Sequence, residues 1–377
     1  MNYYIIAGEA SGDLHGSNLM KALLKKDVNA SFRFWGGDLM QKVSNDLVKH
    51  YKDLAFMGFL EVIMNLKTIS KNLSFCKNDI ENFNPDVIIF IDYPGFNLRI
   101  AKWAKQKGYK THYYISPQIW AWKENRINAI KRDIDKMYVI LPFEKNFYEE
   151  KHHFHVEFVG HPLIDAIADR NQVDEYEFRA NHELSEKPII ALLPGSRKQE
   201  INKMLEVMLS VVDSFPSYQF VIAGAPSQDF EFYKKFIKNK NISFVSNKTY
   251  DLLSVSFAAL VTSGTATLET AIFKIPQVVC YKGSWLSYQI GKRLVKLKYI
   301  SLVNLIMDKE VVKELIQNDF NTKNLKKELN VILDPNERTK YFMNYYELEK
   351  ALGGKGASEK TAKLIFKAIK HQFTHEI

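Results

Sequence analysis

The sequence predicts an α/β protein with two doubly wound parallel sheets, each covered by helices. Three observations support this prediction. Short β-branched or aromatic runs alternate with segments of helical period, and this alternation breaks at a polar segment, residues 170–187, and then restarts. A chain of 377 residues is also too long for one core and suits two domains of ordinary size. We therefore expect two Rossmann-like domains that face each other across a cleft.

The first half of the chain contains a series of runs that read as strands. These are YYIIAG, SFRFWGG, DVIIFID, THYYIS and KMYVILP. Segments of helical period lie between them, for example residues 14–24 and 98–106. Repeated alternation of this kind is typical of a parallel sheet with helices on both faces.

The second half repeats the pattern. Its strand-like runs are PIIALLPGS, YQFVIAG, ISFVS, FAALVTS and PQVVCY. The end of the chain, residues 324–377, reads as helices only. We predict an N-terminal domain over residues 1–165, a C-terminal domain over 166–345, and helices over 346–377 that pack back across the first domain.

Composition and motifs narrow the class of protein. The chain is 46% hydrophobic and 25% charged, as is normal for a soluble globular protein. The opening residues enter a strand at once, so we expect no signal peptide, and no apolar run is long enough to cross a bilayer. Cys76 and Cys280 lack ligand or redox spacing, which favours reduced core residues and a cytosolic protein. Neither a dinucleotide-binding G-x-G-x-x-G after the first strand nor a P-loop is present.

A strand-to-helix turn that could bind an anion begins the second half. In LLPGSRKQEI, residues 192–201, Gly195 turns the chain, Ser196 can cap the next helix, and Arg197 lies at the start of that helix. An arginine beside free backbone N–H groups suits a phosphate, because its planar fork donates two hydrogen bonds at once. The alternative is a surface arginine without a ligand.

A second turn of the same kind occurs in TSGTATLETA, residues 262–271. Ser263, Gly264 and Thr265 follow an apolar run and precede a segment that reads as helix. Two such turns on one sheet edge predict a diphosphate site. Glu269, one helical turn further on, could accept hydrogen bonds from both hydroxyls of a ribose. The alternative for Glu269 is a buried carboxylate paired with Lys or Arg.

Carboxylates follow two predicted strands of the first half. Asp92 ends one strand, where open α/β sheets bind ligands, and is a candidate general base, with turn capping as the alternative. In the following turn, Asn97 can cap the next helix. Glu9 and Asp13, with Gly12 between them, follow the first strand and are candidates for the same cleft. Asp13 can instead cap the first helix.

Aromatic and basic residues gather in the stretch YYISPQIWAWKENR, residues 113–126. Trp120 and Trp122 are candidates to line a sugar or acyl pocket, and core packing is the alternative. Residues 99–132 contain nine Lys or Arg and one acid, Glu124. Such a region suits nucleic acid, an anionic membrane or a phosphorylated substrate, with solvated helix faces as the alternative. No nucleic-acid-binding module is recognisable, so we expect no nucleic-acid partner.

Candidate metal ligands are weak. Asp133 and Asp135 form a D-x-D pair at a predicted helix end, where turn capping is favoured over a divalent cation. The histidines lack metal spacing with acids. We assign no metal and no cofactor.

An apolar stretch, LAFMGFLEVIMNLKTISKNL at residues 54–73, exceeds what a core helix needs. Its leading residues Phe56, Met57 and Phe59 could form an exposed patch for a lipid chain or membrane. A second stretch, residues 281–299, mixes Lys and Arg with Trp and Tyr and contains no acid. Both are candidates for contact with an anionic membrane surface.

The motifs together resemble one known family. AGEASGD, MGFLEV, ID-x-P-x-FN, ISPQIWAWKENR, LPFEKNFYE, VGHPL, LLPGSRKQEI, TSGTATLE and SLVNLI occur in the order of lipid-A-disaccharide synthase, a glycosyltransferase family of GT-B type. The resemblance extends to about Leu315. It implies an inverting, metal-independent enzyme that joins UDP-2,3-diacylglucosamine to 2,3-diacylglucosamine 1-phosphate (lipid X). The products are UDP and a β-1',6-linked disaccharide for lipid A and lipopolysaccharide.

The resemblance also assigns roles to residues. It implies that the N-terminal domain binds the acceptor and the membrane, and that the C-terminal domain binds the UDP-sugar. It also implies that Asn304 in SLVNLI lies near the active site as a catalytic residue that orients a substrate. Arg197 then stabilises the leaving diphosphate. Many relatives have an acid where this chain has Gly95, so the base here is Asp92 or Glu9. Proline is usual in the family where Val303 stands.

The family further implies a cytoplasmic protein bound peripherally to the inner face of the cytoplasmic membrane, and leaves a homodimer open. Two other classes remain as alternatives. One is another UDP-sugar enzyme of this architecture, such as a 2-epimerase or a peptidoglycan-type transferase. The other is a non-catalytic nucleotide-sugar sensor.

Overall fold

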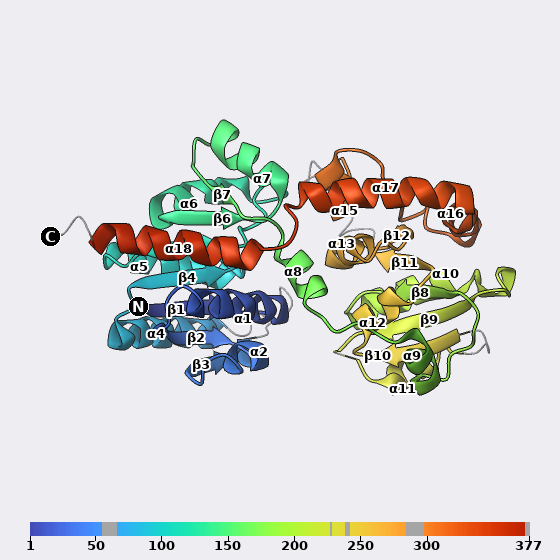
Figure 1. Ribbon diagram of the computed structural model, residues 1–377, viewed down its shortest axis with the longest axis horizontal. Helices are drawn as coiled ribbons and strands as arrows, with labels where there is room; N and C mark the ends of the chain where they lie inside the picture. Colours follow the sequence, from blue (N-terminus) through green and yellow to red (C-terminus); the bar gives the residue numbers. More distant parts are fainter. Residues whose placement is uncertain (55–65, 227, 238–241, 284–297, 374–377) are drawn as a thin grey trace. The chain divides into compact units, whose positions relative to one another are not determined.

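The computed structural model describes most of the 377-residue chain. The described residues are 1–54, 66–226, 228–237, 242–283 and 298–373. They divide into two units, Met1–Ala168 with Leu352–Ile377, and Asp169–Ala351. Figure 1 shows a parallel sheet flanked by helices in each unit.

The described part of the first unit contains one seven-stranded parallel sheet. Its strands are β1 (Asn2–Ala7), β2 (Ser31–Gly36), β3 (Leu47–His50), β4 (Val87–Ile91), β5 (Thr111–Tyr114), β6 (Lys136–Val139) and β7 (Glu157–Phe158). Their order across the sheet is β3-β2-β1-β4-β5-β6-β7. The central strands β1 and β4 are almost wholly buried, as expected for strands covered by helices on both faces.

Helices connect these strands and cover the sheet. They are α1 (Ala10–Leu24), α2 (Asp38–Gln41), α4 (Leu66–Phe83), α5 (Pro94–Gln106), α6 (Ile127–Asp133), α7 (Pro142–Asn146), α8 (Pro162–Ala168) and α18 (Ala357–Phe373). Short single-turn helices occur at Tyr51–Leu54, Glu124–Arg126 and Phe147–Lys151. The last helix, α18, packs against α1 and α8, so the end of the chain completes the unit in which the chain began.

The second unit has the same design with six strands among its described residues. They are β8 (Ile189–Leu193), β9 (Gln219–Gly224), β10 (Ile242–Ser246), β11 (Ala258–Thr262), β12 (Gln277–Tyr281) and β13 (Lys313–Ile316), in the order β10-β9-β8-β11-β12-β13. The helices are α9 (Glu175–Asn181), α10 (Lys198–Leu209), α11 (Phe230–Lys234), α12 (Thr249–Ser254), α13 (Thr265–Ile272), α15 (Leu302–Met307), α16 (Thr322–Leu333) and α17 (Pro335–Ala351), with a single turn at Val212–Ser214.

The strand order reverses once in each sheet. In the first unit the reversal lies between β1 and β4, where Ala7 pairs with Ile91. In the second unit it lies between β8 and β11, where Leu193 pairs with Val261. Connections leave these neighbouring strands toward opposite faces of the sheet, so a crevice opens at their carboxyl ends. Glu9, Asp92, Arg197 and the turn Ser263–Thr265 follow those four strands.

The predicted α/β class and the parallel sheets are confirmed. Each strand-like run in the sequence forms a strand, and the helical segments 14–24 and 98–106 lie within α1 and α5. Three strands were not predicted: β3, β7 and β13. All three are edge strands of four residues or fewer and are mostly half-exposed, so they lack the apolar run that marks a central strand.

Candidate active site

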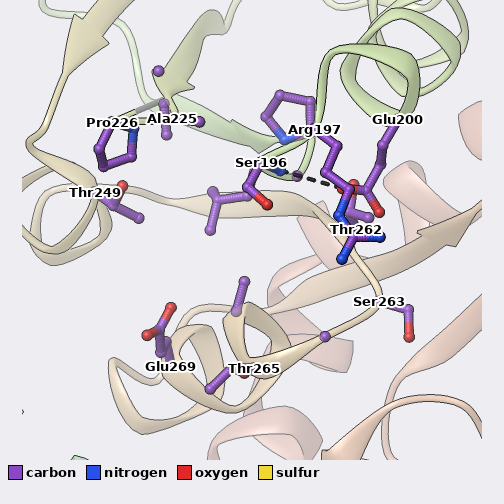
Figure 2. Close-up of a pocket in the computed structure, with 17 residues that line it drawn as sticks. Ser196, Arg197, Glu200, Ala225, Pro226, Thr249, Thr262, Ser263, Thr265 and Glu269 are labelled. Atoms are coloured by element: carbon purple, nitrogen blue, oxygen red, sulfur yellow. Dashed lines mark hydrogen bonds between the residues drawn. The ribbon is translucent and has the colours of Figure 1, made fainter. Parts of the chain in front are cut away.

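A pocket of about 490 Å³ opens at the reversal point of the second sheet. Its lining includes all the residues assigned to the diphosphate and ribose from the sequence, namely Gly195, Ser196, Arg197, Ser263, Gly264, Thr265 and Glu269. Figure 2 shows the two turns facing each other across this pocket, with Arg197 and Glu200 at one end and Glu269 at another. The two turns therefore lie at one edge of the sheet, as the sequence predicts.

The turn after β8 is held by a side chain that the sequence did not single out. Gly195 has φ +99°, a left-handed conformation that favours glycine. The backbone N–H of Ser196 donates to Oε2 of Glu200 at 3.2 Å. A Cβ at Gly195 would lie 2.2 Å from that same oxygen. The carboxylate of Glu200 thus occupies an N–H group that an anion could use.

Ser196 does not cap α10, contrary to the prediction. The N-cap position belongs to Arg197, and it makes no side-chain capping bond. The described residues give the Arg197 guanidinium no ion pair, although its side chain lies at the pocket. An exposed guanidinium at a helix start is suited to a diphosphate, because it adds two parallel donors to the backbone N–H groups.

The turn after β11 starts α13. The first N–H groups of this helix have no intrahelical partner, because no helical carbonyl precedes them. Thr265 and Ala266, which carry two of these groups, line the pocket. Thr262 is 4% exposed, and within the described chain its Oγ1 has no hydrogen-bond partner. Ser263 is less available, because its hydroxyl donates to the carbonyl of Ile300 at 2.9 Å. The backbone amides and the hydroxyls of Thr262 and Thr265 are polar groups of this turn that line the pocket.

Glu269 lies partly buried in α13. Tyr250 of α12 donates its hydroxyl to Oε1 of Glu269 at 2.8 Å, and burial raises the pKa of this carboxyl. The described residues provide no Lys or Arg partner, so the ion-pair alternative does not hold within them. The second carboxylate oxygen is left to accept hydrogen bonds from a ligand. Tyr250 has no signature in the sequence, since only the tertiary fold brings α12 to α13.

In the first unit, Asp92 stands at the end of β4 in an uncommon backbone conformation. Asp92 and Tyr93 have φ values of 44° and 49°, and such left-handed residues cluster at functional sites. The Asp92 carbonyl accepts hydrogen bonds from the hydroxyl of Tyr113 at 2.5 Å and from Nδ2 of Asn97 at 2.7 Å. Asn97 therefore anchors the end of the strand and does not cap α5 as predicted.

The environment of the Asp92 carboxyl raises its pKa to about 6. Burial is the largest cause, and the nearby negative charge of Glu9 adds to it, while the backbone N–H of Tyr93 opposes both. Glu9 itself is exposed at the start of α1. A carboxyl with this pKa is mostly ionised at neutral pH and remains a stronger base than an ordinary aspartate.

Asp13 has a structural task that differs from both predicted ones. Its carboxylate accepts backbone N–H groups of Gly37 at 2.8 Å and of Leu39 and Met40 at 3.0 Å. It therefore caps the short helix α2, not the first helix. Asp13 is only 3% exposed, so its carboxylate is not accessible to the acceptor substrate. Gly12 is also structural, because an added Cβ would lie 3.1 Å from the Ala7 side chain.

The tryptophan loop after β5 is fixed by a buried glutamate. Glu144 of α7 accepts hydrogen bonds from the Ser116 hydroxyl at 2.6 Å and from Nε1 of Trp120 at 3.2 Å. Two backbone N–H groups, those of Ile140 and Leu141, bind its other oxygen, and burial raises its pKa to about 7. Trp120 is thus held from one edge.

Trp122 in the same loop is 48% exposed, with Lys123 and Arg126 near its ring face. This leaves one indole fixed and one accessible. Their assignment to a sugar or acyl pocket remains a prediction.

Comparison with known proteins decides the family. The profile of the lipid-A-disaccharide synthetase family matches residues 3–369. The chain belongs to this lipid-A-disaccharide synthetase family. It is 38% identical to the lipid-A-disaccharide synthase of Syntrophus aciditrophicus over 374 residues, covering 97% of each chain. It is 36% identical to the enzyme of the same name from Geobacter metallireducens, covering 97% of this chain and 96% of that one.

Solved structures outside the lipid-A-disaccharide synthetase family have a similar fold. The UDP-GlcNAc 2-epimerase of Neisseria meningitidis, bound to UDP-GlcNAc, has a TM-score of 0.66 at 13% identity and covers 98% of this chain and 100% of its own. MnaA of S. aureus with UDP has a TM-score of 0.68 at 13% identity, covering 99% and 97%. At these identities the likeness shows the two-domain fold alone.

In this member of the lipid-A-disaccharide synthetase family, the Asn304 side chain makes its hydrogen bonds within the protein. Its Nδ2 donates to the Val312 carbonyl at 2.8 Å and to Oε1 of Glu314 at 2.9 Å, and its Oδ1 accepts the N–H groups of Val311 and Val312. The side chain is fully buried, and these four bonds use every donor and acceptor it has. The structure therefore corrects its predicted role: Asn304 fixes the approach to β13.

At Gly95 an added Cβ would meet nothing within 4 Å, so an acid fits there, and its absence leaves Asp92 as the acid of this turn. Asp133 pairs with Arg132, and Asp135 accepts the N–H of Thr111, so both acids are engaged locally.

The described residues contain no group of three or more metal-ligating side chains and no helix long and apolar enough to span a membrane. The predicted lipid contacts Phe56, Met57 and Phe59 lie outside the described residues, as do residues 284–297 of the second predicted membrane stretch.

Proposed function

We propose that this protein transfers a diacylglucosaminyl group from UDP-2,3-diacylglucosamine to the 6-hydroxyl of 2,3-diacylglucosamine 1-phosphate. The products are a β-1',6-linked disaccharide 1-phosphate and UDP. The observation that carries the proposal is the family match over residues 3–369 together with the polar pocket at the reversal point of the second sheet. A polar pocket at this position is what a nucleotide-sugar transferase requires to bind its donor.

The second unit binds the donor in this proposal. The diphosphate lies against the turns after β8 and β11, where Arg197 and the backbone N–H groups of Gly264 and Thr265 donate to it. Glu269 accepts hydrogen bonds from the ribose hydroxyls through the oxygen that faces the pocket. As the glycosidic bond breaks, negative charge grows on the diphosphate, and the fixed donors stabilise it without having to reorient.

The first unit supplies the base. The Asp92 carboxylate takes the proton of the acceptor 6-hydroxyl while that oxygen forms its bond to the anomeric carbon of the donor. The bond from the anomeric carbon to the diphosphate breaks with its electron pair on UDP, so the anomeric centre is inverted. The raised pKa of Asp92 strengthens the base, and the local charge of Glu9 contributes to it. A metal ion takes no part in these steps.

Lipid substrates require access to a membrane. We propose that residues 54–73 and 281–299 and the exposed Trp122 contact the inner face of the cytoplasmic membrane. Each lysine near an anionic surface contributes roughly 1 kcal/mol. Flotation with vesicles that contain anionic lipid tests this. The protein should rise with the vesicles at low salt and remain at the bottom with neutral ones; a protein that never rises contradicts membrane contact.

The activity is tested with purified protein, UDP-2,3-diacylglucosamine and lipid X. UDP and disaccharide should form in equal amounts, and neither should form without the acceptor. UDP release without acceptor would indicate a hydrolase, and isomerisation of a UDP-sugar without UDP release would indicate an epimerase. The epimerase alternative has only the shared fold in its favour.

A further inference from the structure

A second pocket adjoins the donor pocket. It has a volume of about 340 Å³. It is lined by Arg197, Lys198, Gln199, Glu200, Lys203, Met204, Tyr281, Lys282 and Gly283. Arg197 and Glu200 line both pockets, and Figure 2 shows these two side chains together at one end of the donor pocket. The two pockets therefore share part of their lining. The donor assignments given above leave the second pocket without a ligand.

The charge of the second pocket is strongly positive. Four cationic side chains line it, against one carboxylate, that of Glu200. Within the described chain, Lys198, Lys203 and Lys282 make no ion pair; Lys198 only approaches the ring of Phe232, at 5.7 Å. Gathered ammonium groups repel one another, and an anion of two charges relieves that repulsion.

The chemistry of the acceptor supplies such an anion. The acceptor carries its reacting hydroxyl and its phosphate on the same sugar, so its phosphate lies one sugar ring away from the anomeric carbon of the donor. That carbon is bonded to the diphosphate held in the first pocket. The diphosphate and the acceptor phosphate therefore need two anion sites near each other, and the two pockets share Arg197 and Glu200 in their linings. Lysines suit a terminal phosphate because each acts as a mobile point charge.

We propose that the second pocket binds the phosphate monoester of the acceptor through Lys198, Lys203 and Lys282. The proposal rests on the proposed function and adds a recognition element to it. The enzyme selects a phosphorylated acceptor over its free alcohol by charge in the C-terminal unit. Glu200 separates the two anions and keeps the diphosphate and the monoester in their own pockets.

The test compares two acceptors, 2,3-diacylglucosamine 1-phosphate and the same molecule without phosphate, with wild type and a Lys203→Ala/Lys282→Ala variant. Removing two charge-assisted contacts should raise KM for the phosphorylated acceptor about tenfold or more. KM for the alcohol and the Kd for UDP should be unchanged. Lys234→Ala is the matched control, since Lys234 is exposed in the same unit and pairs with Glu231.

The outcomes separate the proposals. An equal loss with both acceptors, or a matching loss of UDP affinity, overturns the acceptor-phosphate site and assigns these lysines to folding or to the donor. If wild type forms no disaccharide, the proposed function fails on its own. Binding of glucosamine 1-phosphate to UDP-saturated protein, followed by calorimetry, then decides the pocket directly. Weakened binding in the double variant supports a monoester site, and unchanged binding removes it.

Discussion

Asp92 and Glu269 are both carboxyls with raised pKa values, yet their neighbours fit them for different tasks. Burial and the charge of Glu9 act on Asp92, so its proton affinity increases and it suits proton transfer. Glu269 is also buried, but the Tyr250 hydroxyl binds one of its oxygens and fixes its orientation. A fixed carboxylate is better suited to hold hydroxyl groups than to exchange protons.

The pKa of Asp92 predicts the acid limb of activity. The base must be ionised, so kcat/KM of wild type should fall about tenfold per pH unit below a midpoint near pH 6. Glu9→Gln removes the charge that helps raise this pKa, so the midpoint should move to lower pH. Burial is the larger cause and should keep it above the ordinary aspartate value.

Two variants make this assignment specific. Asp92→Asn should remain folded and lose about 10²- to 10⁴-fold in kcat. Glu81→Gln, an exposed carboxylate paired with Lys107 in the same unit, is the control and should leave the midpoint unchanged. Near-normal turnover of Asp92→Asn would exclude Asp92 as the base.

Glu269 should discriminate ribose from deoxyribose. Wild type should bind UDP about tenfold or more tightly than 2'-deoxy-UDP, because a hydrogen bond to a charged acceptor is lost. Glu269→Gln should reduce this ratio. Calorimetry with both nucleotides measures it, and Glu206→Gln on the exposed side of α10 serves as control. The same ratio in wild type and Glu269→Gln would place the ribose elsewhere.

Arg197 should act on the leaving group. Arg197→Ala should lower kcat by about 10²- to 10³-fold, as expected when one fixed donor to a developing anion is removed. Arg197→Lys should recover part of the loss, since it restores charge without the two-pronged donor. Steady-state kinetics at saturating donor distinguish this from weaker binding; a change in KM alone would contradict the role.

At the scale of elements, the turns at the reversal points position these side chains. The turns after β1 and β4 carry Glu9 and Asp92, and those after β8 and β11 carry Arg197 and the α13 start. Two of these turns are secured by a contact distant in sequence: Tyr113 donates to the Asp92 carbonyl after β4, and Ser263 donates to the Ile300 carbonyl after β11. Secondary structure alone would not hold them.

The Asp13 contact is testable by stability. Asp13→Ala removes the acceptor of three N–H groups and should lower the free energy of unfolding by about 1–2 kcal/mol. Asp13→Asn keeps one acceptor oxygen and should cost less. Urea unfolding measures both, and UDP affinity should not change. A loss of UDP affinity without a loss of stability would return Asp13 to the ligand site.

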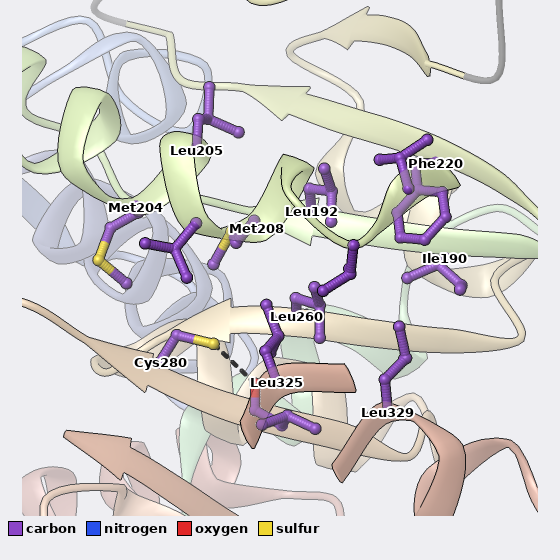
Figure 3. Close-up of a cluster of buried hydrophobic side chains, with 14 of the residues drawn as sticks. Ile190, Leu192, Met204, Leu205, Met208, Phe220, Leu260, Cys280, Leu325 and Leu329 are labelled. Atoms are coloured by element: carbon purple, nitrogen blue, oxygen red, sulfur yellow. Dashed lines mark hydrogen bonds between the residues drawn. The ribbon is translucent and has the colours of Figure 1, made fainter. Parts of the chain in front are cut away.

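At the scale of the whole molecule, each unit has its own apolar core. The core of the second unit includes Leu192, Met204, Leu260 and Leu325, which Figure 3 shows packed between the sheet and its helices. The first unit has a separate cluster around Tyr4, Trp35 and Phe90 on its own sheet. The donor pocket is lined by residues of one unit only.

This division predicts where UDP should act. UDP alone should slow amide hydrogen exchange in the turns after β8 and β11, because bound ligand stabilises the structure it contacts. The turns after β1 and β4 should exchange at their original rates. Mass spectrometry of the full-length protein with and without UDP provides the measurement. Protection of equal size in both units would show that the donor site is not confined to the second.

How far the sequence could be read depends on the range of the interactions. The central strands and the polar turns after them were predictable, since a buried strand is a local apolar run and a turn is a local cluster of small residues. The edge strands β3, β7 and β13 were not, because they rely on a neighbour for most of their burial. The predicted roles of Asp13, Asn97, Ser196 and Asn304 were wrong because the folded backbone decides which groups a polar side chain meets. The partners of Asp13 are distant in sequence, whereas those of Asn97 and Asn304 lie nearby along the chain in a geometry that no local pattern shows.

The sequence by itself determined the α/β class, the family and the residues at the ends of the strands, because these are encoded in local runs and ordered motifs. Only the tertiary structure decided which polar side chains remain free. Asp13 and Asn304 look as reactive in the sequence as Asp92 does, but hydrogen-bond partners from other segments occupy their polar atoms. Asp92 and Glu269 keep an oxygen available because folding buries them without giving them a cationic partner.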